Sequence, residues 1–160
     1  MSRMLAAMIV MARDRTYEGL LEDLRGRKVL ILTCNTCARF CGVGGREAAA
    51  DLASRMFADG IDVEGVESSA ACCFMKNAVS SMASAGERFD TVLAICCDVG
   101  ARNAAEASGK PVVNPIITFG AGYLDRDGVP HAVSIVCGRT VRDDPLPKLA
   151  EESGCLTGPF

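Results

Sequence analysis

The chain contains no tryptophan and a single histidine, His131, and aromatic residues make up only 5% of it. One histidine, on a predicted edge strand, supports no Ser/His/Asp or Cys/His catalytic set and is most simply a surface residue. It also argues against the histidine-rich sites that bind iron or copper. Any metal centre in this chain must therefore be built almost entirely from thiolates.

An excess of basic residues is also missing. The 17 lysines and arginines face 20 aspartates and glutamates, which gives a net charge of −3. The sequence therefore lacks the basic footprint of nucleic-acid-binding proteins, and we expect no nucleic-acid partner. The apolar segment near the start of the chain is too short to span a bilayer, so we expect no membrane span either.

That apolar segment covers residues 4–12 and is followed at once by charged residues. Methionines recur within it at helical spacing, at Met4, Met8 and Met11, which favours a helix over a signal peptide. We therefore predict an N-terminal helix within residues 1–27 that packs on the core or on a partner subunit.

Cysteine, by contrast, is abundant, with nine in 160 residues. The number is odd, and a hydrophobic content of 49% is enough for a core at this length. The chain therefore does not resemble a small disulfide scaffold. We expect a reducing compartment, the cytoplasm, in which the thiols are kept for metal or redox chemistry.

Residues 28–138 alternate between strand-like and helix-like patterns. Strands are expected at 29–33, 61–66, 90–95 and 110–119, and helices at 47–57, 74–86 and 100–108. This order predicts one α/β domain with a Rossmann/flavodoxin-like three-layer fold and a mostly parallel sheet of about four to six strands.

The end of the chain departs from this alternation. Asp127-Gly128 is a hairpin turn signal before a strand at 131–136, which predicts an antiparallel hairpin at the edge of the sheet. Residues 139–160 are expected to form a C-terminal tail with a short charged helix.

The densest group of cysteines follows the first expected strand directly, at Cys34, Cys37 and Cys41 in the motif CNTCARFC. Thiolates at this spacing on an irregular loop can occupy three corners of an iron–sulfur cubane or three vertices of a zinc tetrahedron. A C-x2-C-x3-C triplet with a remote fourth cysteine favours a [4Fe–4S] cluster, because structural zinc more often uses two separated C-x2-C pairs. Zinc is the alternative cofactor.

The fourth ligand must come from a distant part of the chain. Cys72 and Cys73 follow the second expected strand, and Cys96 follows the third. In a right-handed parallel sheet these strand ends share one edge, where ligands gather in open α/β folds. We therefore expect Cys72 or Cys73 to complete the site, with Cys96 as the rival. The remaining cysteines could equally be small buried hydrophobic residues: Cys97, Cys137 and Cys155.

Three segments resemble a known family. LTCNTCARFCGVGGRE at 32–47 resembles the GCGTCxxVCxxGGEKE opening of the methylenetetrahydrofolate reductase C-terminal-type domain, the small cysteine-rich V subunit that accompanies the flavin-bearing reductase of acetogens. AICCDVGAR at 94–102 is similar to its ACGxGxQ segment, with Cys97 where glycine is usual. NPIITFG at 114–120 is similar to its PxxNTxFxG stretch. The likeness runs in order over residues 28–122.

The resemblance implies a [4Fe–4S] cluster held by cysteines of these segments: Cys34, Cys37, Cys41 and Cys72 or Cys73, with Cys96 beside them. It also implies a non-catalytic electron-transfer subunit in the one-carbon metabolism of anaerobes. The partner would then be a flavin-containing methylenetetrahydrofolate reductase catalytic subunit or a methyltransferase. A homo-oligomer is also open.

Two other functions stay open on the residues alone. Cys72-Cys73 or Cys96-Cys97 beside a cluster could serve a cysteine-dependent iron–sulfur redox enzyme, although the sequence Cys-Cys-Phe lacks the CCG of disulfide-reducing enzymes of that type. The other alternative is a structural zinc-binding scaffold protein with no redox role.

Overall fold

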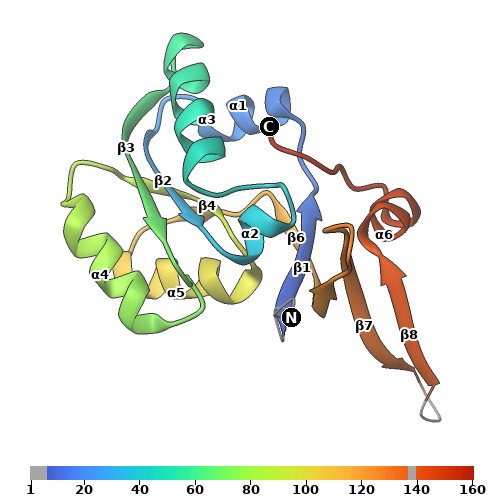
Figure 1. The fold of residues 1–160 in the computed structure, drawn as a ribbon. Coiled ribbons are helices and arrows are strands. Elements are labelled where there is room, and N and C mark those ends of the chain that lie inside the picture. The colour runs from blue at the N-terminus through green and yellow to red at the C-terminus, as the bar shows by residue number, and fades with distance from the viewer. Residues whose placement is uncertain (1–6, 137–139) are drawn as a thin grey trace.

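A computed structural model describes residues 7–136 and 140–160 as an α/β protein with two separate sheets (Figure 1). The strands are β1 (Met8–Arg13), β2 (Lys28–Cys34), β3 (Asp62–Ser69), β4 (Thr91–Ile95), β5 (Val112–Val113), β6 (Ile116–Leu124), β7 (Pro130–Val136) and β8 (Thr140–Pro145). The helices are α1 (Tyr17–Leu24), α2 (Cys37–Phe40), α3 (Arg46–Ala58), α4 (Met75–Ala85), α5 (Asp98–Ser108) and α6 (Leu146–Ser153). No helix in these two ranges is long and apolar enough to cross a membrane.

The first sheet consists of four parallel strands in the order β3-β2-β4-β5, as the alternating sequence pattern predicted. Its two central strands are deeply buried: every residue of β4 is buried, and so is every residue of β2 after Lys28. Continuous apolar runs are typical of strands that are covered on both faces. The chain leaves β2 towards β3 on one side and later returns to β4 on the other.

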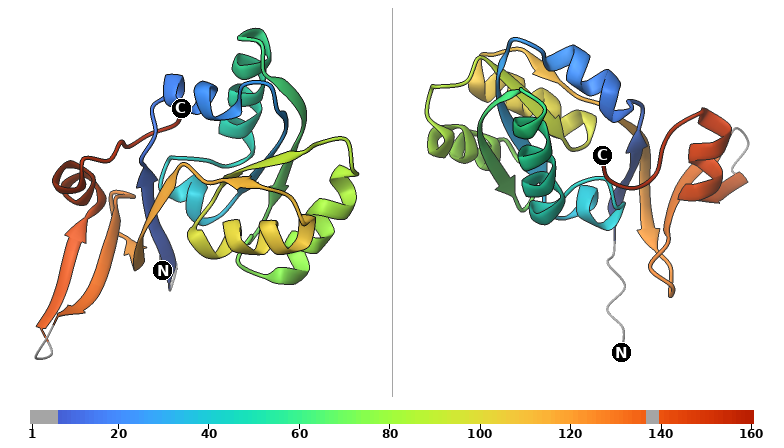
Figure 2. Two further views of the ribbon diagram at one scale, coloured as in Figure 1. Left: turned by 180° about the vertical axis from the view of Figure 1, so that it is seen from behind. Right: turned by 90° about the horizontal axis from the view of Figure 1, so that it is seen from above.

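Helices cover both faces of the parallel sheet. Figure 1 shows α3 on one face, with α1 beside it, and α4 and α5 together on the other, and Figure 2 shows the same arrangement from behind and above. Tyr17 ties α1 to α3, because its hydroxyl donates to Asp59 Oδ2 at 2.6 Å and its ring lies 3.6 Å from the guanidinium of Arg55. The C-terminal edge of the sheet carries the loops that hold the cysteines.

The second sheet is antiparallel and has the order β1-β6-β7-β8. β1 is its edge strand, and it pairs with β6 so that Ile9 lies opposite Ala121, with a bulge between Val10 and Met11. The two ends of the chain also meet here, since Arg13 forms an isolated antiparallel bridge with Leu156.

The predicted N-terminal helix is wrong where the structure describes it. Residues 8–13 form the strand β1, and the helix α1 covers only residues 17–24; residues 1–6 of the predicted helix lie outside the described residues. Four of the six residues of β1 are buried, and the other two are half-buried. A short run that is apolar on all sides fits a strand or a helix equally well, and pairing with β6 decides the outcome.

The predicted strand at 110–119 is split between the two sheets. Val112 and Val113 form β5 in the parallel sheet, and Ile116 begins β6 in the antiparallel sheet. Pro115 lies between them and has no N–H for a sheet ladder, which explains the break. The predicted hairpin exists as β6 and β7, but it belongs to the antiparallel sheet and not to the edge of the parallel one.

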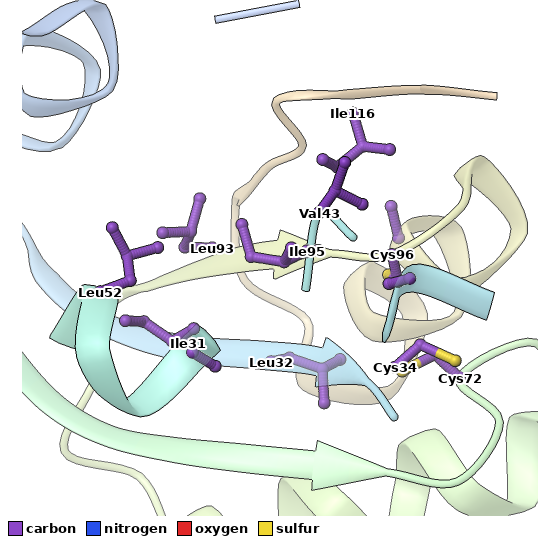
Figure 3. Packing of buried hydrophobic residues seen from close by; sticks show 14 of the residues in the cluster. Ile31, Leu32, Cys34, Val43, Leu52, Cys72, Leu93, Ile95, Cys96 and Ile116 are labelled. Atoms are coloured by element: carbon purple, nitrogen blue, oxygen red, sulfur yellow. The ribbon is translucent and has the colours of Figure 1, made fainter. Parts of the chain in front are cut away.

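The hydrophobic core extends from the middle of the parallel sheet to its C-terminal edge (Figure 3). Ile31, Leu93 and Leu52 pack between β2, β4 and α3, and they are between 0 and 5% exposed. The same cluster continues at the strand ends with Cys34 and Cys96. The cysteines thus lie at the end of the core and not on a free loop.

Candidate metal centre

Three cysteines from distant parts of the chain lie together at the C-terminal edge of the parallel sheet. Cys34 is the last residue of β2, Cys72 lies in the turn between β3 and α4, and Cys96 follows β4 directly. Figure 3 shows these side chains side by side where the strands end. Their exposed fractions are only 6%, 1% and 0%. The sheet topology therefore brings together thiols that the sequence separates.

The thiols contact one another in a line from Cys37 to Cys34, Cys72 and Cys96. Hydrogen bonds with Cys37 and Cys72 hold the pKa of Cys34 well below its usual value, against the effect of burial. The contact with Cys34 and burial raise the pKa of Cys37. Contacts with Cys34 and Cys96, followed by burial, raise the pKa of Cys72. The thiols beside Cys34 thus favour its thiolate form over their own.

Gly100, in the first turn of α5, makes the close approach of Cys72 and Cys96 possible. A β-carbon at this position would lie 2.8 Å from Cys72 Cβ and 2.8 Å from Cys96 Sγ. Both distances are shorter than real contacts of a β-carbon allow. A residue with a side chain here would push the two cysteines apart.

A buried asparagine on α5 fixes the turn in which Cys72 points inward and Cys73 points to solvent. Asn103 is 4% exposed, and its amide donates to the carbonyl oxygens of Cys72 at 3.2 Å and Cys73 at 2.9 Å. The turn is thereby held with Cys72 turned inward, whereas Cys73 is exposed. Of the two residues that the sequence left open, only Cys72 contacts other thiols in the described part of the chain.

The other two cysteines of the triplet lie beside the edge strand β1. The Ile9 N–H donates to Cys37 Sγ at 3.4 Å, and the Cys41 thiol donates to the Ile9 carbonyl oxygen at 3.5 Å. Burial raises the pKa of Cys41 to about 11, while the Met11 backbone acts on it in the opposite direction. The cysteine loop of the parallel sheet is therefore attached to the antiparallel sheet through sulfur.

Thr33 anchors this loop from within the core. Its hydroxyl donates to the Ile95 carbonyl oxygen at 3.2 Å and accepts the Gly45 N–H at 2.9 Å. Thr33 is fully buried, so both bonds are shielded from water. A β-carbon at Gly44 would lie 2.7 Å from the same hydroxyl, and the glycine therefore lets the loop return closely to the strand end.

Of the remaining cysteines, Cys97 is the N-cap residue of α5, and burial raises the pKa of its thiol. It lies near enough to Cys96 and Cys73 for their charges to raise that pKa further. Cys155 is half-buried near the C-terminus. Cys137 lies outside the described residues.

A polar cluster that no sequence motif indicated surrounds His131 in the antiparallel sheet. The ring Nδ1 lies 2.7 Å from Asp143 Oδ1, and Nε2 lies 3.0 Å from Asp125 Oδ2. The Tyr123 hydroxyl donates to Asp143 at 2.6 Å, and its ring stacks on His131. Only the register of β6, β7 and β8 brings these residues together, and no local sequence motif predicts this cluster.

The chemistry of the contacting donors fits a soft, thiolate-bound metal or an iron–sulfur cluster, because the groups that contact one another at the strand ends are all sulfur. The positions of these thiols, however, do not match a complete metal-binding site. Within residues 7–136 and 140–160, no group of three or more histidine, cysteine, aspartate or glutamate side chains is arranged so that it could hold a metal ion. The thiols interact in successive pairs, and they would have to move to surround a single metal centre.

A scan against models of protein families, a search of curated proteins and a search of solved structures found no match to this chain.

Proposed function

We propose that this chain is an iron–sulfur accessory subunit that transfers electrons in a methylenetetrahydrofolate reductase-type or related methyl-transfer complex in the cytoplasm. The observation that carries the proposal is the convergence of the thiols of Cys34, Cys72 and Cys96 at one sheet edge, with Cys37 in contact with Cys34. The strand order β3-β2-β4-β5 supports a flavodoxin-like arrangement, in which ligands bind where the chain switches direction. That point lies between β2 and β4, beside Cys34 and Cys96.

The residues of this edge would hold the centre as follows. Cys34, Cys37 and Cys72 supply three thiolates, and the fourth comes from Cys41, as the triplet spacing predicts, or from Cys96. When bound, a [4Fe–4S] cluster supplies one-electron transfer. The Ile9 N–H donates to Cys37 Sγ, and a hydrogen bond of this kind stabilises charge on a ligating sulfur.

The surroundings of the site favour a role in a complex. Cys73 is exposed next to Phe74, which is 64% exposed, and Val99 in the first turn of α5 is 54% exposed. Exposed apolar side chains are typical of a surface that meets another protein where they form a contiguous patch, and we propose that Phe74 and Val99 belong to such a surface. The identity of the partner, a flavin-containing reductase or a methyltransferase, rests on the resemblance of residues 32–47, 94–102 and 114–120.

Zinc is the second candidate, and the direct contacts of Cys34 with Cys37 and Cys72 favour it. Thiolates on one zinc ion, each about 2.3 Å from the metal, lie close to one another. Those on different corners of a cubane are farther apart. A zinc site would make the edge structural.

Metal analysis of the anaerobically purified chain tests the proposal. We expect about four irons and a similar amount of sulfide per chain, with a broad brown absorbance. A colourless protein with about one zinc per chain would contradict it and support the structural site. The variant Cys155→Ser is the control, because its half-buried thiol lies away from the site, and its metal content should equal that of the unmodified chain.

A further inference from the structure

We infer that the fourth ligand of the centre is Cys96 and that Cys41, despite its place in the triplet, joins the centre to the edge strand β1. This inference rests on the proposed metal centre and assigns its ligands. It departs from the C-x2-C-x3-C spacing, which groups Cys41 with Cys34 and Cys37.

Contacts between thiols support Cys96. The side chains of Cys34, Cys72 and Cys96 lie together at the edge of the sheet (Figure 3), and Cys72 Cβ and Cys96 Sγ both approach the same point of α5. The pKa of Cys72 is raised by both Cys34 and Cys96, and that of Cys34 is lowered by Cys37 and Cys72, in keeping with this arrangement. The side chain of Cys96 is fully buried. It comes from β4, whose pairing with β2 fixes its position relative to Cys34.

The missing side chain at Gly100 also supports Cys96. The absence of a β-carbon there lets Cys72 Cβ and Cys96 Sγ both approach the start of α5. If Cys96 were only a small buried hydrophobic residue, a larger residue at position 100 with a smaller one at position 96 would fill the same space. The arrangement instead brings a sulfur close to Cys72.

The hydrogen bond of Cys41 argues against its being a ligand. Its thiol donates to the carbonyl oxygen of Ile9 at 3.5 Å. A sulfur bound to a metal has no proton to donate, so ligation would remove this bond. The Cys34 thiol also faces a carbonyl oxygen, that of Ala70, but at 3.9 Å, so ligation would cost Cys34 only a long contact and Cys41 a shorter one. Cys37 accepts the Ile9 N–H, and that bond is compatible with ligation.

The need of β1 for hydrogen-bond partners explains why a cysteine lies there. β1 is the edge strand of the antiparallel sheet, and the backbone groups on its outer side must find partners when they are buried. Cys37 and Cys41 lie at the two ends of the short helix α2, and together their sulfurs satisfy the N–H and the C=O of Ile9. Cys41, the third cysteine of the motif, thus supplies β1 with a hydrogen bond that a neighbouring strand would otherwise provide.

The variants Cys41→Ser and Cys96→Ser, purified anaerobically as full chains, test this assignment by iron, sulfide and zinc content and by visible spectrum. We expect Cys41→Ser to keep the metal content and spectrum of the unmodified chain, because a serine hydroxyl can also donate to Ile9. We expect Cys96→Ser to lose most of its metal. Cys155→Ser is the matched control and should behave like the unmodified chain.

Two results would overturn the assignment. One is a Cys41→Ser chain that is folded by circular dichroism but has lost metal or has a shifted spectrum, as an oxygen ligand would cause. The other is a Cys96→Ser chain with full metal content and an unchanged spectrum. If Cys41→Ser does not fold, Cys41→Thr, which keeps the hydroxyl, replaces it under the same criteria.

The same experiment separates failure of the assignment from failure of the proposed function. An unmodified chain with zinc in place of iron contradicts electron transfer, yet loss of that zinc in Cys96→Ser and not in Cys41→Ser still supports the ligand set. An unmodified chain that binds neither metal overturns both.

Discussion

The central strands β4 and β6 of the two sheets differ in how deeply they are buried. In the parallel sheet, all five residues of β4 are buried. In the antiparallel sheet, β6 is as central as β4, yet only its first residue, Ile116, is fully buried. A sheet with helices on both faces excludes water from its strands, whereas a sheet covered on one side keeps a solvated face.

Hydrogen bonds between side chains link three strands of the antiparallel sheet. Tyr123, His131 and Asp143 link β6, β7 and β8 through hydrogen bonds of 2.6 and 2.7 Å. Near the chain ends, Arg13 donates to the Gly158 carbonyl oxygen at 2.8 Å. The comparison shows that one chain can stabilise one sheet by burial and its neighbour by polar contacts.

The first test of this comparison, with the largest expected effect, shortens one apolar side chain in each sheet. Leu32→Ala, in fully buried β2, should lower the free energy of unfolding by about 2–5 kcal/mol. Val133→Ala, in β7 and 37% exposed, should cost about 1 kcal/mol or less. Urea denaturation measures both, and equal losses would show that the two sheets depend on burial alike.

The second test removes a buried polar group, the Thr33 hydroxyl, from the parallel sheet. Thr33→Val leaves the buried Gly45 N–H without its acceptor and removes the bond to Ile95, and each group left without a partner costs about 1–3 kcal/mol. Thr118→Val is the control, because half-buried Thr118 loses a single bond, from the Asp98 N–H at 3.0 Å. Denaturation curves should give Thr33→Val a clearly lower free energy of unfolding than the control. A Thr33→Val chain that is as stable as the control would mean that the loop anchor contributes nothing.

The third test overfills the sheet edge where the thiols meet. Gly100→Ala improves helix propensity by about 1 kcal/mol, but overpacking against Cys72 and Cys96 should outweigh it and leave a net loss of about 1 kcal/mol. Gly19→Ala in α1 is the matched control, since its β-carbon would meet nothing closer than 3.3 Å. Thermal unfolding compares the two, and a Gly100→Ala chain no less stable than Gly19→Ala would contradict close packing at this edge.

The smallest expected effect concerns pH and the antiparallel sheet. Burial disfavours a charged His131 ring, but hydrogen bonds with Asp125 and Asp143 outweigh this and raise its pKa. The stability that the ring contributes is therefore complete below the unfolded-state pKa of about 6.5 and is lost as pH rises through the higher folded-state value. The lowered pKa values of the two carboxyls add stability above about pH 3.9 that disappears as pH falls below it.

Thermal unfolding of the unmodified chain and of His131→Gln across this range measures the effect. The difference in melting temperature should be a few degrees, largest at pH 5 to 6 and smallest above about pH 8, because an uncharged ring gains little from the carboxylates. A difference that is the same at every pH would mean that His131 acts by packing on Tyr123 and not by its charge.

Sequence patterns predicted the parallel half of the fold well and the antiparallel half poorly. The strands and helices between residues 28 and 108 have clear periods and turn residues, and their order fixes which ends share an edge. Convergence of Cys34, Cys72 and Cys96 follows from that order alone. The strand at Met8–Arg13 could not be separated from a helix, because its nature depends on β6, which lies far along the chain.

The roles of individual cysteines could be predicted only in part. Spacing groups Cys34, Cys37 and Cys41, but the hydrogen bond of Cys41 depends on Ile9, which the motif does not contain. The inward turn of Cys72 depends on Asn103, a residue that no local pattern marks. Long-range partners of this kind are visible only once the fold is known.

The pairing of β1 with β6 also orders events during synthesis. Met8 pairs with Gly122 and Arg13 with Ile116, so β1 must wait until residues 116–122 have left the ribosome before it finds its partner. By then the strands that carry Cys34, Cys72 and Cys96 have all emerged. The cysteines at the ends of the parallel strands can therefore come together before β1 packs beside Cys37 and Cys41.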